Sequence, residues 1–147
     1  MKQNLLIIEK NEGILFLLNT VLQKSFRIHK YGNCLSGIDA VKSHNISSIV
    51  ISADSEDELN YDFIVHLKTS YLYSSIPVFV ITNNDSSSFS DQLKSIGVTD
   101  IIQKPFDPLS LLKKIEVSVS EQDYVYESPS YIFNITNTRK LKVGFLN

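Results

Sequence analysis

The stretch Val98-Thr99-Asp100-Ile101-Ile102-Gln103-Lys104-Pro105-Phe106-Asp107-Pro108-Leu109 decides the fold. Ile101-Ile102 is a short apolar run of the kind that forms a buried strand. The strand must stop at Lys104, because Pro105 cannot donate to a sheet ladder and restrains the residue before it. Asp107-Pro108 then opens a helix with a carboxylate N-cap and a proline at the first helical position. Lys104 is therefore predicted at the C-terminal rim of a strand, where sites form in open α/β sheets.

The chain before this stretch repeats the same alternation of strand and helix. Further strands are predicted at 5–8, 26–31, 46–53 and 76–81, and helices at 14–22, 36–44, 61–71, 86–96 and 108–120. In the third helix we expect four side chains to face inward, namely Phe63, Ile64, Leu67 and Tyr71. Alternation with short connections predicts an α/β fold: a five-stranded parallel sheet, doubly wound by five strand–helix units.

The last part of the chain has a different pattern. Tyr131-Ile132-Phe133 and Leu141-Lys142-Val143 are β-like runs, and Pro129 interrupts any helix before them. We interpret residues 1–120 as one domain and residues 121–147 as a C-terminal extension that forms a β-hairpin. Because a lone hairpin is marginally stable in water, it should pack on something, and one option is a second copy in a homodimer.

Composition excludes several classes of protein. The 147 residues suffice for one domain with a real core, and a net charge of -2 argues against a general nucleic-acid binder. The single cysteine, Cys34, excludes an internal disulfide framework and favours a buried apolar role. No stretch approaches the ~20 apolar residues that span a bilayer, so we expect a cytoplasmic protein without membrane contact.

On these residues the chain resembles the response-regulator receiver domains of bacterial two-component signalling, over Asn4 to Ser120. Ile81-Thr82 and Lys104-Pro105-Phe106, with the spacing between them, carry the resemblance. Gly97-Val98-Thr99-Asp100 and Ser36-Gly37-Ile38-Asp39-Ala40 are similar to two further family segments. The resemblance implies the flavodoxin-like receiver fold, a role in phosphorelay signal transduction, and a histidine kinase or an effector protein as partner.

The resemblance also implies roles for single residues. In the family, a threonine and a lysine hold the oxygens of a phosphoryl group, and Thr82 and Lys104 match them. An acidic pair after the first strand binds Mg²⁺. Here that pair falls on Glu9 and Lys10, and the lysine brings a positive charge to the place of the cation. Mg²⁺ is therefore disfavoured, with Glu9 and Asp54 as the remaining candidate ligands.

The phospho-acceptor position has two candidates. Counting back from the third helix gives Asp54, whereas counting forward from the apolar run gives Ser52. Both side chains leave the same face of an extended chain, ~7 Å apart along it. Asp54 is favoured because it keeps the helix in register and supplies a carboxylate. With Ser52 in that position, phosphorylation in the family's manner is lost.

We therefore expect a non-enzymatic signalling module, a pseudo-receiver that acts through protein–protein contacts with weak or no aspartyl phosphorylation. One alternative is a conventional receiver that is phosphorylated on Asp54 with Mg²⁺. Another is a small-molecule or cofactor-binding protein on a flavodoxin-like fold, although Glu9-Lys10-Asn11-Glu12 is neither a hydroxyl-rich phosphate loop nor a Gly-x-Gly-x-x-Gly motif. A DNA-binding role for the tail is disfavoured, because it lacks a helix for a winged-helix module.

Overall fold

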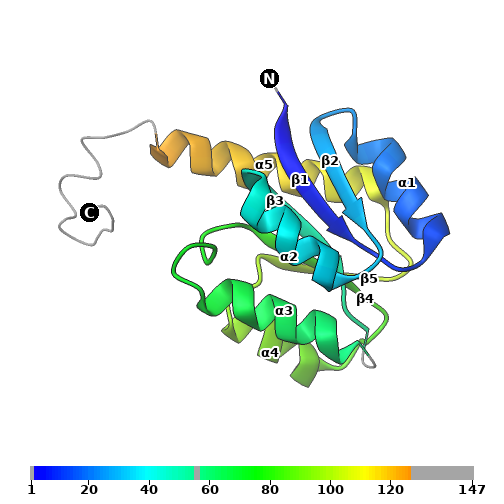
Figure 1. Ribbon diagram of the computed structural model, residues 1–147. Helices are drawn as coiled ribbons and strands as arrows, with labels where there is room; N and C mark the ends of the chain where they lie inside the picture. Colours follow the sequence, from blue (N-terminus) through cyan, green and yellow to red (C-terminus); the bar gives the residue numbers. More distant parts are fainter. Residues whose placement is uncertain (1, 55–56, 127–147) are drawn as a thin grey trace. The chain divides into compact units, whose positions relative to one another are not determined.

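The computed structural model describes residues 2–54 and 57–126. Five parallel strands form a sheet in the order β2-β1-β3-β4-β5, with helices as connections (Figure 1). The elements in chain order are β1 (Gln3–Ile8), α1 (Glu12–Leu22), β2 (Phe26–Tyr31), α2 (Cys34–Ser43), β3 (Ile46–Ser52), α3 (Glu58–Thr69), β4 (Val78–Thr82), α4 (Ser87–Ser95), β5 (Asp100–Gln103) and α5 (Pro108–Tyr126). The doubly wound fold expected from the sequence is confirmed, with β2 at one edge of the sheet.

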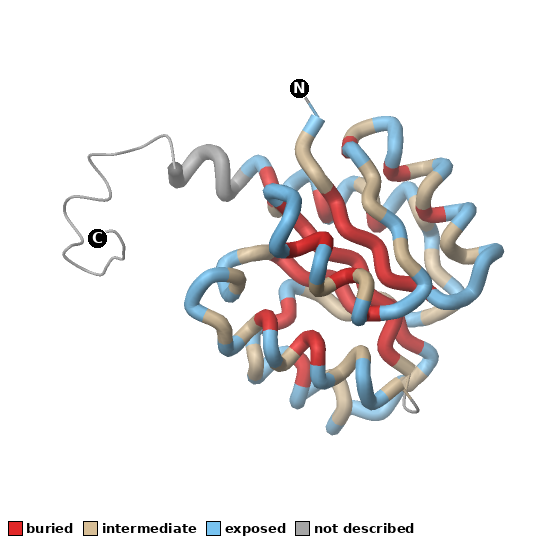
Figure 2. The backbone as a smooth tube through the Cα atoms, in the orientation of Figure 1, coloured by how far each residue is buried: buried red, intermediate tan, exposed pale blue. Residues whose placement is uncertain are grey.

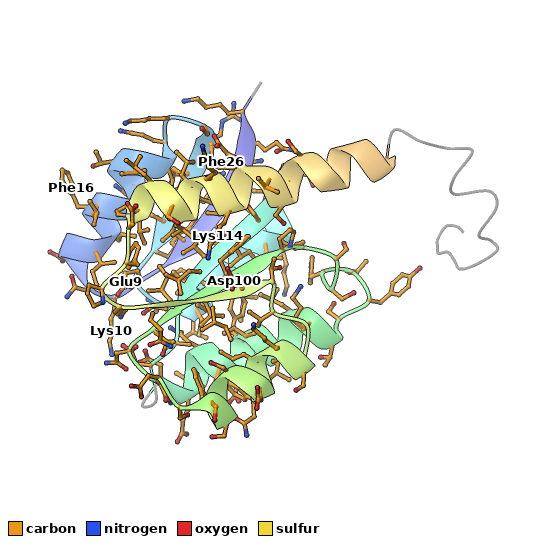
Figure 3. All side chains as sticks on the ribbon, turned by 180° about the vertical axis from the view of Figure 1, so that it is seen from behind. Glu9, Lys10, Phe16, Phe26, Asp100 and Lys114 are labelled. Carbon is orange, nitrogen blue, oxygen red and sulfur yellow. The ribbon has the colours of Figure 1, made fainter. Side chains whose placement is uncertain are left out.

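The central strands β1, β3 and β4 are continuously apolar because both faces of the sheet are covered. On one face, strand residues form a core cluster with buried residues of α2, α3 and α4. Its members include Leu6, Ile8, Ile49, Ile51, Val78 and Val80 from the strands, and Ala40, Val41, Phe63, Ile64, Leu67 and Leu93 from the helices. The alternate strand residues point to the opposite face, where α1 and α5 lie (Figure 3). Figure 2 shows the buried residues concentrated along these strands.

Side-chain caps explain where several helices begin. Asn11 Oδ1 accepts a hydrogen bond of 3.0 Å from Ile14 N at the start of α1, and Asn33 Oδ1 accepts one of 3.0 Å from Ser36 N in α2. Ser86 caps α4 in the same way, through a bond of 3.2 Å from Phe89 N to its hydroxyl oxygen. These caps satisfy backbone donors that the first turn of a helix leaves without partners.

The helix boundaries differ from the expectation, most clearly in α2, α3 and α5. Helix α2 begins at Cys34 rather than Ser36, because Asn33 provides the cap. Helix α3 begins at Glu58 and ends at Thr69, so Tyr71 lies beyond it and is 97 % exposed, not turned inward. Helix α5 continues past Ser120 to Tyr126. No glycine or proline stands between Pro108 and Pro129 to stop it earlier.

The C-terminal part of the chain is described only as far as this helix. Residues Met1–Ile115 form one compact unit, and the chain from Glu116 onward belongs to a second. The expected hairpin at 130–147 lies outside the described residues. Among the described helices, none combines the length and the apolar character needed to cross a membrane.

Candidate functional site

The carboxyl ends of β1, β3, β4 and β5 meet at one edge of the sheet. The strand register places Ile8 opposite Ile51, Ser52 opposite Ile81, and Thr82 opposite Gln103. The residues that follow these strands therefore gather at the same edge, as parallel strands require. They include Glu9, Asp54 and Lys104, three of the residues that the sequence singled out.

Lys104 contacts both candidates for the acceptor position. Its ammonium lies 3.2 Å from Asp54 Oδ2 and donates a hydrogen bond of 3.1 Å to Ser52 Oγ. The Lys104 and Asp54 side chains are only 19 % and 11 % exposed, so water screens this ion pair weakly. The backbone N–H of Lys104 also donates to the Thr82 carbonyl, over 2.9 Å. One lysine thus joins the ends of β3, β4 and β5.

The Asp54 carboxylate has a partner on each of its oxygens. Oδ2 faces the Lys104 ammonium, and Oδ1 accepts a hydrogen bond of 2.7 Å from the backbone N–H of Asn83. Hydrogen bonds to an ionised carboxylate are roughly twice as strong as those between neutral groups. Asp54 therefore anchors the residue that directly follows β4, a contact that nothing in the sequence signals.

Lys10 forms its ion pair with Asp57 rather than with Asp54. Lys10 Nζ lies 3.1 Å from Asp57 Oδ1, and Asp57 Oδ2 accepts a bond of 3.1 Å from the backbone N–H of Asp54. Asp57 precedes α3 yet makes no side-chain cap bond to that helix. The lysine side chain is 66 % exposed and the aspartate 13 %. Sequence reasoning missed Asp57, because it lies in an acidic stretch between the predicted strand at 46–53 and the predicted helix at 61–71, where carboxylates are ordinarily solvated.

Glu9 is the buried acid of the site. It is 2 % exposed, and its Oε2 accepts a hydrogen bond of 2.9 Å from Asn11 N. Its Oε1 is buried and has no hydrogen-bond partner within the described part of the chain. Figure 3 shows Glu9 and Lys10 where they follow β1. Burying an oxygen without a hydrogen-bond donor costs free energy. A cation bound beside Glu9 Oε1 would offset this cost.

Thr82 is fully buried, and its hydroxyl is engaged locally. Thr82 Oγ1 accepts a hydrogen bond of 3.0 Å from Asn84 N, within the loop that follows β4. The hydroxyl oxygen thus supports its own loop, while the Thr82 carbonyl accepts from Lys104 N. Asn83 was not singled out as a site residue, because its contact with Asp54 uses a backbone N–H group, which every residue but proline carries.

The donor set does not fit a magnesium ion well. Among the described residues, no group of three or more His, Cys, Asp and Glu side chains is arranged to hold a metal. Both Asp54 oxygens are occupied, and Lys10 contributes an ammonium group beside the acidic residues. Mg²⁺ prefers near-octahedral oxygen ligation. Of the carboxylate oxygens of Glu9 and Asp54, Glu9 Oε1 is the one without a hydrogen-bond partner among the described residues.

Comparison with known proteins identifies the family. Residues 5–116 match the model of the response regulator receiver domain. The chain belongs to the receiver-domain family. It is accordingly part of two-component signalling, as a signalling module rather than a classical enzyme, and receiver domains in general interact with kinases and effectors. No protein of curated function matches the chain.

Several solved receiver structures share the fold. An orphan response regulator of H. pylori, HP1043, is 21% identical, with 80% of this chain and 96% of that chain covered and a TM-score of 0.67. The chemotaxis response regulator CheY4 of Vibrio cholerae is 17% identical, over 80% and 99%, with a TM-score of 0.71. The receiver domain of sensor histidine kinase PA1611 from Pseudomonas aeruginosa, which holds magnesium in its active-site cleft, is 14% identical, over 82% and 99%, with a TM-score of 0.70.

Proposed function

We propose that this receiver domain is a pseudo-receiver, which signals through protein–protein contacts with weak or no aspartyl phosphorylation. The observation that carries the proposal is the Lys10–Asp57 ion pair, with 3.1 Å between nitrogen and oxygen. The resemblance assigns Lys10 the place of an acid that binds Mg²⁺. A lysine held there keeps a positive charge where the divalent cation would lie, and the two like charges would repel each other.

The state of Asp54 supports the same conclusion. Phosphoryl transfer requires an aspartate oxygen that is free to attack, with a cation to neutralise the charge that develops on the phosphoryl oxygens. Here one Asp54 oxygen faces Lys104 and the other accepts from Asn83 N, at 3.2 and 2.7 Å. A nucleophile with both oxygens engaged must break one of these contacts before it reacts. The two features together oppose phosphorylation at separate steps, metal binding and attack.

One observation favours the conventional alternative, a receiver phosphorylated on Asp54 with Mg²⁺. Glu9 Oε1 is buried without a hydrogen-bond donor among the described residues, and a cation would satisfy it. The Lys10 side chain is largely exposed, so it could turn toward solvent. Glu9 and Asp54 would then hold the ion. We rank this reading second, because it requires the Lys10–Asp57 pair to break.

Intact-mass measurement separates the two readings. The protein is incubated with Mg²⁺ and acetyl phosphate beside a conventional receiver as positive control. We expect no phosphoryl adduct on this protein under conditions in which the control receiver becomes phosphorylated. A stoichiometric adduct that disappears in Asp54→Asn would overturn the proposal and establish the conventional function. An adduct that persists in Asp54→Asn would locate the acceptor elsewhere.

We further propose that residues 1–120 are the receiver domain and that residues 121–147 are an extension through which two copies associate. The family match at 5–116 supports the first part. Helix α5 is described as far as Tyr126, so truncation after this residue keeps all of the described helix. We expect the full chain to be dimeric and the truncated chain monomeric in light scattering. Identical masses per particle would contradict a role of the tail in association.

A further inference from the structure

The Asp54 carboxylate lies at the start of a chain of hydrogen bonds that reaches α4. Asn83 N donates to Asp54 Oδ1, and the next amide, Asn84 N, donates to Thr82 Oγ1. Asn84 Oδ1 in turn accepts from Ser86 N over 3.0 Å, and the Ser86 hydroxyl caps α4. The whole segment from β4 to the first turn of α4 is thus held by successive bonds.

A second tie comes from β5. Gln103 Nε2 donates a hydrogen bond of 3.0 Å to the Asn84 carbonyl, and Lys104 N donates to the Thr82 carbonyl. The β4–α4 loop (residues 83–86) therefore has neighbours on both sides, β3 through Asp54 and β5 through Gln103. Of these ties, the one to Asp54 is the only one in the described contacts of this loop that involves a charged acceptor.

The surroundings of Asp54 are those of an anion-binding site. The backbone N–H of Asn83 and the ammonium of Lys104 converge on one carboxylate whose side chain is 11 % exposed. Two donors of this kind, one of them cationic, would hold any small oxyanion placed between them. Here the chain supplies the anion itself, from a residue two positions beyond Ser52 at the end of β3.

We propose that Asp54 is an internal anion that fixes the β4–α4 loop in one conformation, so that the α4 surface is presented constitutively instead of being switched by a phosphoryl group. The proposal rests on the proposed pseudo-receiver function, because a domain that is routinely phosphorylated on Asp54 would alter this carboxylate in each cycle. In physical terms, the negative charge of Asp54 holds the Asn83 N–H group and the Lys104 ammonium close together.

Amide hydrogen exchange of the full-length protein, followed by NMR, tests the proposal. In Asp54→Ala the Asn83 amide loses a charge-assisted bond, and we expect its exchange to accelerate about tenfold to a hundredfold. Asp100→Asn is the matched control, because it removes the carboxylate of another lysine–aspartate pair, Asp100–Lys114, which does not contact this loop. Asn83 exchange should be unchanged in the control. Unchanged exchange in Asp54→Ala would overturn the proposal.

Chemical rescue provides an independent readout. Acetate added to Asp54→Ala should occupy the space between Asn83 N–H and Lys104, and restore slow exchange at Asn83. Chloride at the same ionic strength should not. If acetate has no effect beyond that of chloride, the two donors do not form an anion site. Should Asp54→Ala fail to fold, Asp54→Asn retains the shape and removes the charge, and faster Asn83 exchange than in the wild type is again required.

The two proposals fail separately. A phosphoryl adduct on the wild type, read by intact mass, would refute the pseudo-receiver function without touching the exchange data on the unmodified protein. Absence of an adduct together with unchanged Asn83 exchange in Asp54→Ala would leave the pseudo-receiver function and refute the internal anion. The internal-anion proposal also requires that the amide exchange rate of Asn83 in the wild type stay the same when Mg²⁺ and beryllofluoride are added.

Discussion

Gly37 of α2 lies directly against Ile8 at the end of β1, so closely that a Cβ atom on Gly37 would come within 2.5 Å of Ile8 Cδ1. Ile8 is 1 % exposed and belongs to the core, which limits its freedom to move aside. We therefore expect Gly37→Ala to destabilise the domain by about 1–3 kcal/mol, as overpacked cores do. Urea unfolding measures this change.

Gly32 is the matched control for this prediction. Nothing lies within 4 Å of the position where its Cβ would be, so Gly32→Ala should leave the free energy of unfolding nearly unchanged. Equal effects of the two substitutions would show that the approach of α2 to β1 is not tight. The comparison also tests the packing next to the candidate site, because Ile8 directly precedes Glu9.

Lys104 is expected to stabilise the fold as well as the site. Lys104→Met keeps most of the side-chain volume but leaves the Asp54 carboxylate, which is 11 % exposed, without its cation. The loss should be about 1.5–3 kcal/mol in the free energy of unfolding. Lys114→Met removes the more exposed pair with Asp100, visible in Figure 3, and should cost below about 1 kcal/mol. A larger loss for Lys114 than for Lys104 would contradict this ranking.

Replacing Lys10 with an acidic residue should increase the affinity of the site for Mg²⁺. Lys10→Asp removes the positive charge and adds a carboxylate beside Glu9, whose Oε1 is buried without a donor among the described residues. We expect Mg²⁺ affinity to rise on the order of tenfold to a hundredfold, about 1.4–2.7 kcal/mol, because a repelling ammonium is replaced by a carboxylate ligand. Isothermal titration calorimetry measures the affinity, and acetyl phosphate with intact mass measures any gain of phosphorylation.

Lys113→Asp controls for the change in net charge. Lys113 is an exposed residue of α5, so its substitution alters the charge of the protein equally without placing a carboxylate next to Glu9. Mg²⁺ affinity should then stay at the wild-type level. If both variants gain equally, the effect comes from overall charge, and the position of Lys10 has no special part in excluding the metal.

His29 should make stability depend on pH. Burial, followed by the charges of His44 and Arg27, lowers the pKa of His29 below its ordinary value of 6.5. The unfolded chain then binds the proton more readily, so stability falls as pH drops through 6.5 and levels off below the folded-state pKa. His29→Gln should flatten this part of the profile in urea titrations at successive pH values. His66→Gln, on the exposed side of α3, should not; parallel profiles for all three proteins would contradict the prediction.

Sequence reasoning located the strands well, because a strand covered on both faces must be apolar throughout. The runs from Leu5 to Ile8 and from Ile49 to Ile51 are continuously apolar, as this type of strand requires. It also kept both Ser52 and Asp54 as candidates for the acceptor position, since residues two positions apart on an extended chain share a face. The observed contacts of Lys104 with both residues, at 3.1 and 3.2 Å, agree with that geometry.

Other features had no sequence signal, for identifiable physical reasons. The bond from Asn83 to Asp54 uses a backbone N–H, which does not depend on residue type. Asp57 lay in an acidic stretch before the helix predicted at 61–71, where a carboxylate is ordinarily solvated, but it accepts a hydrogen bond from Asp54 N and pairs with Lys10. The predicted helix at 108–120 was too short because Glu121 to Glu127 is mostly polar, whereas the helix continues to Tyr126.

The Lys10–Asp57 pair has a consequence for how the domain responds to its ionic surroundings. Its lysine is 66 % exposed, whereas the Lys104–Asp54 pair is largely shielded. At physiological salt the Debye length is about 8 Å, so dissolved ions weaken the exposed pair first. Rising salt should therefore weaken the Lys10–Asp57 link between the end of β1 and the start of α3 while the Asp54 contacts persist. Changing the ionic strength should thus weaken the Lys10–Asp57 pair and leave the Lys104–Asp54 pair intact.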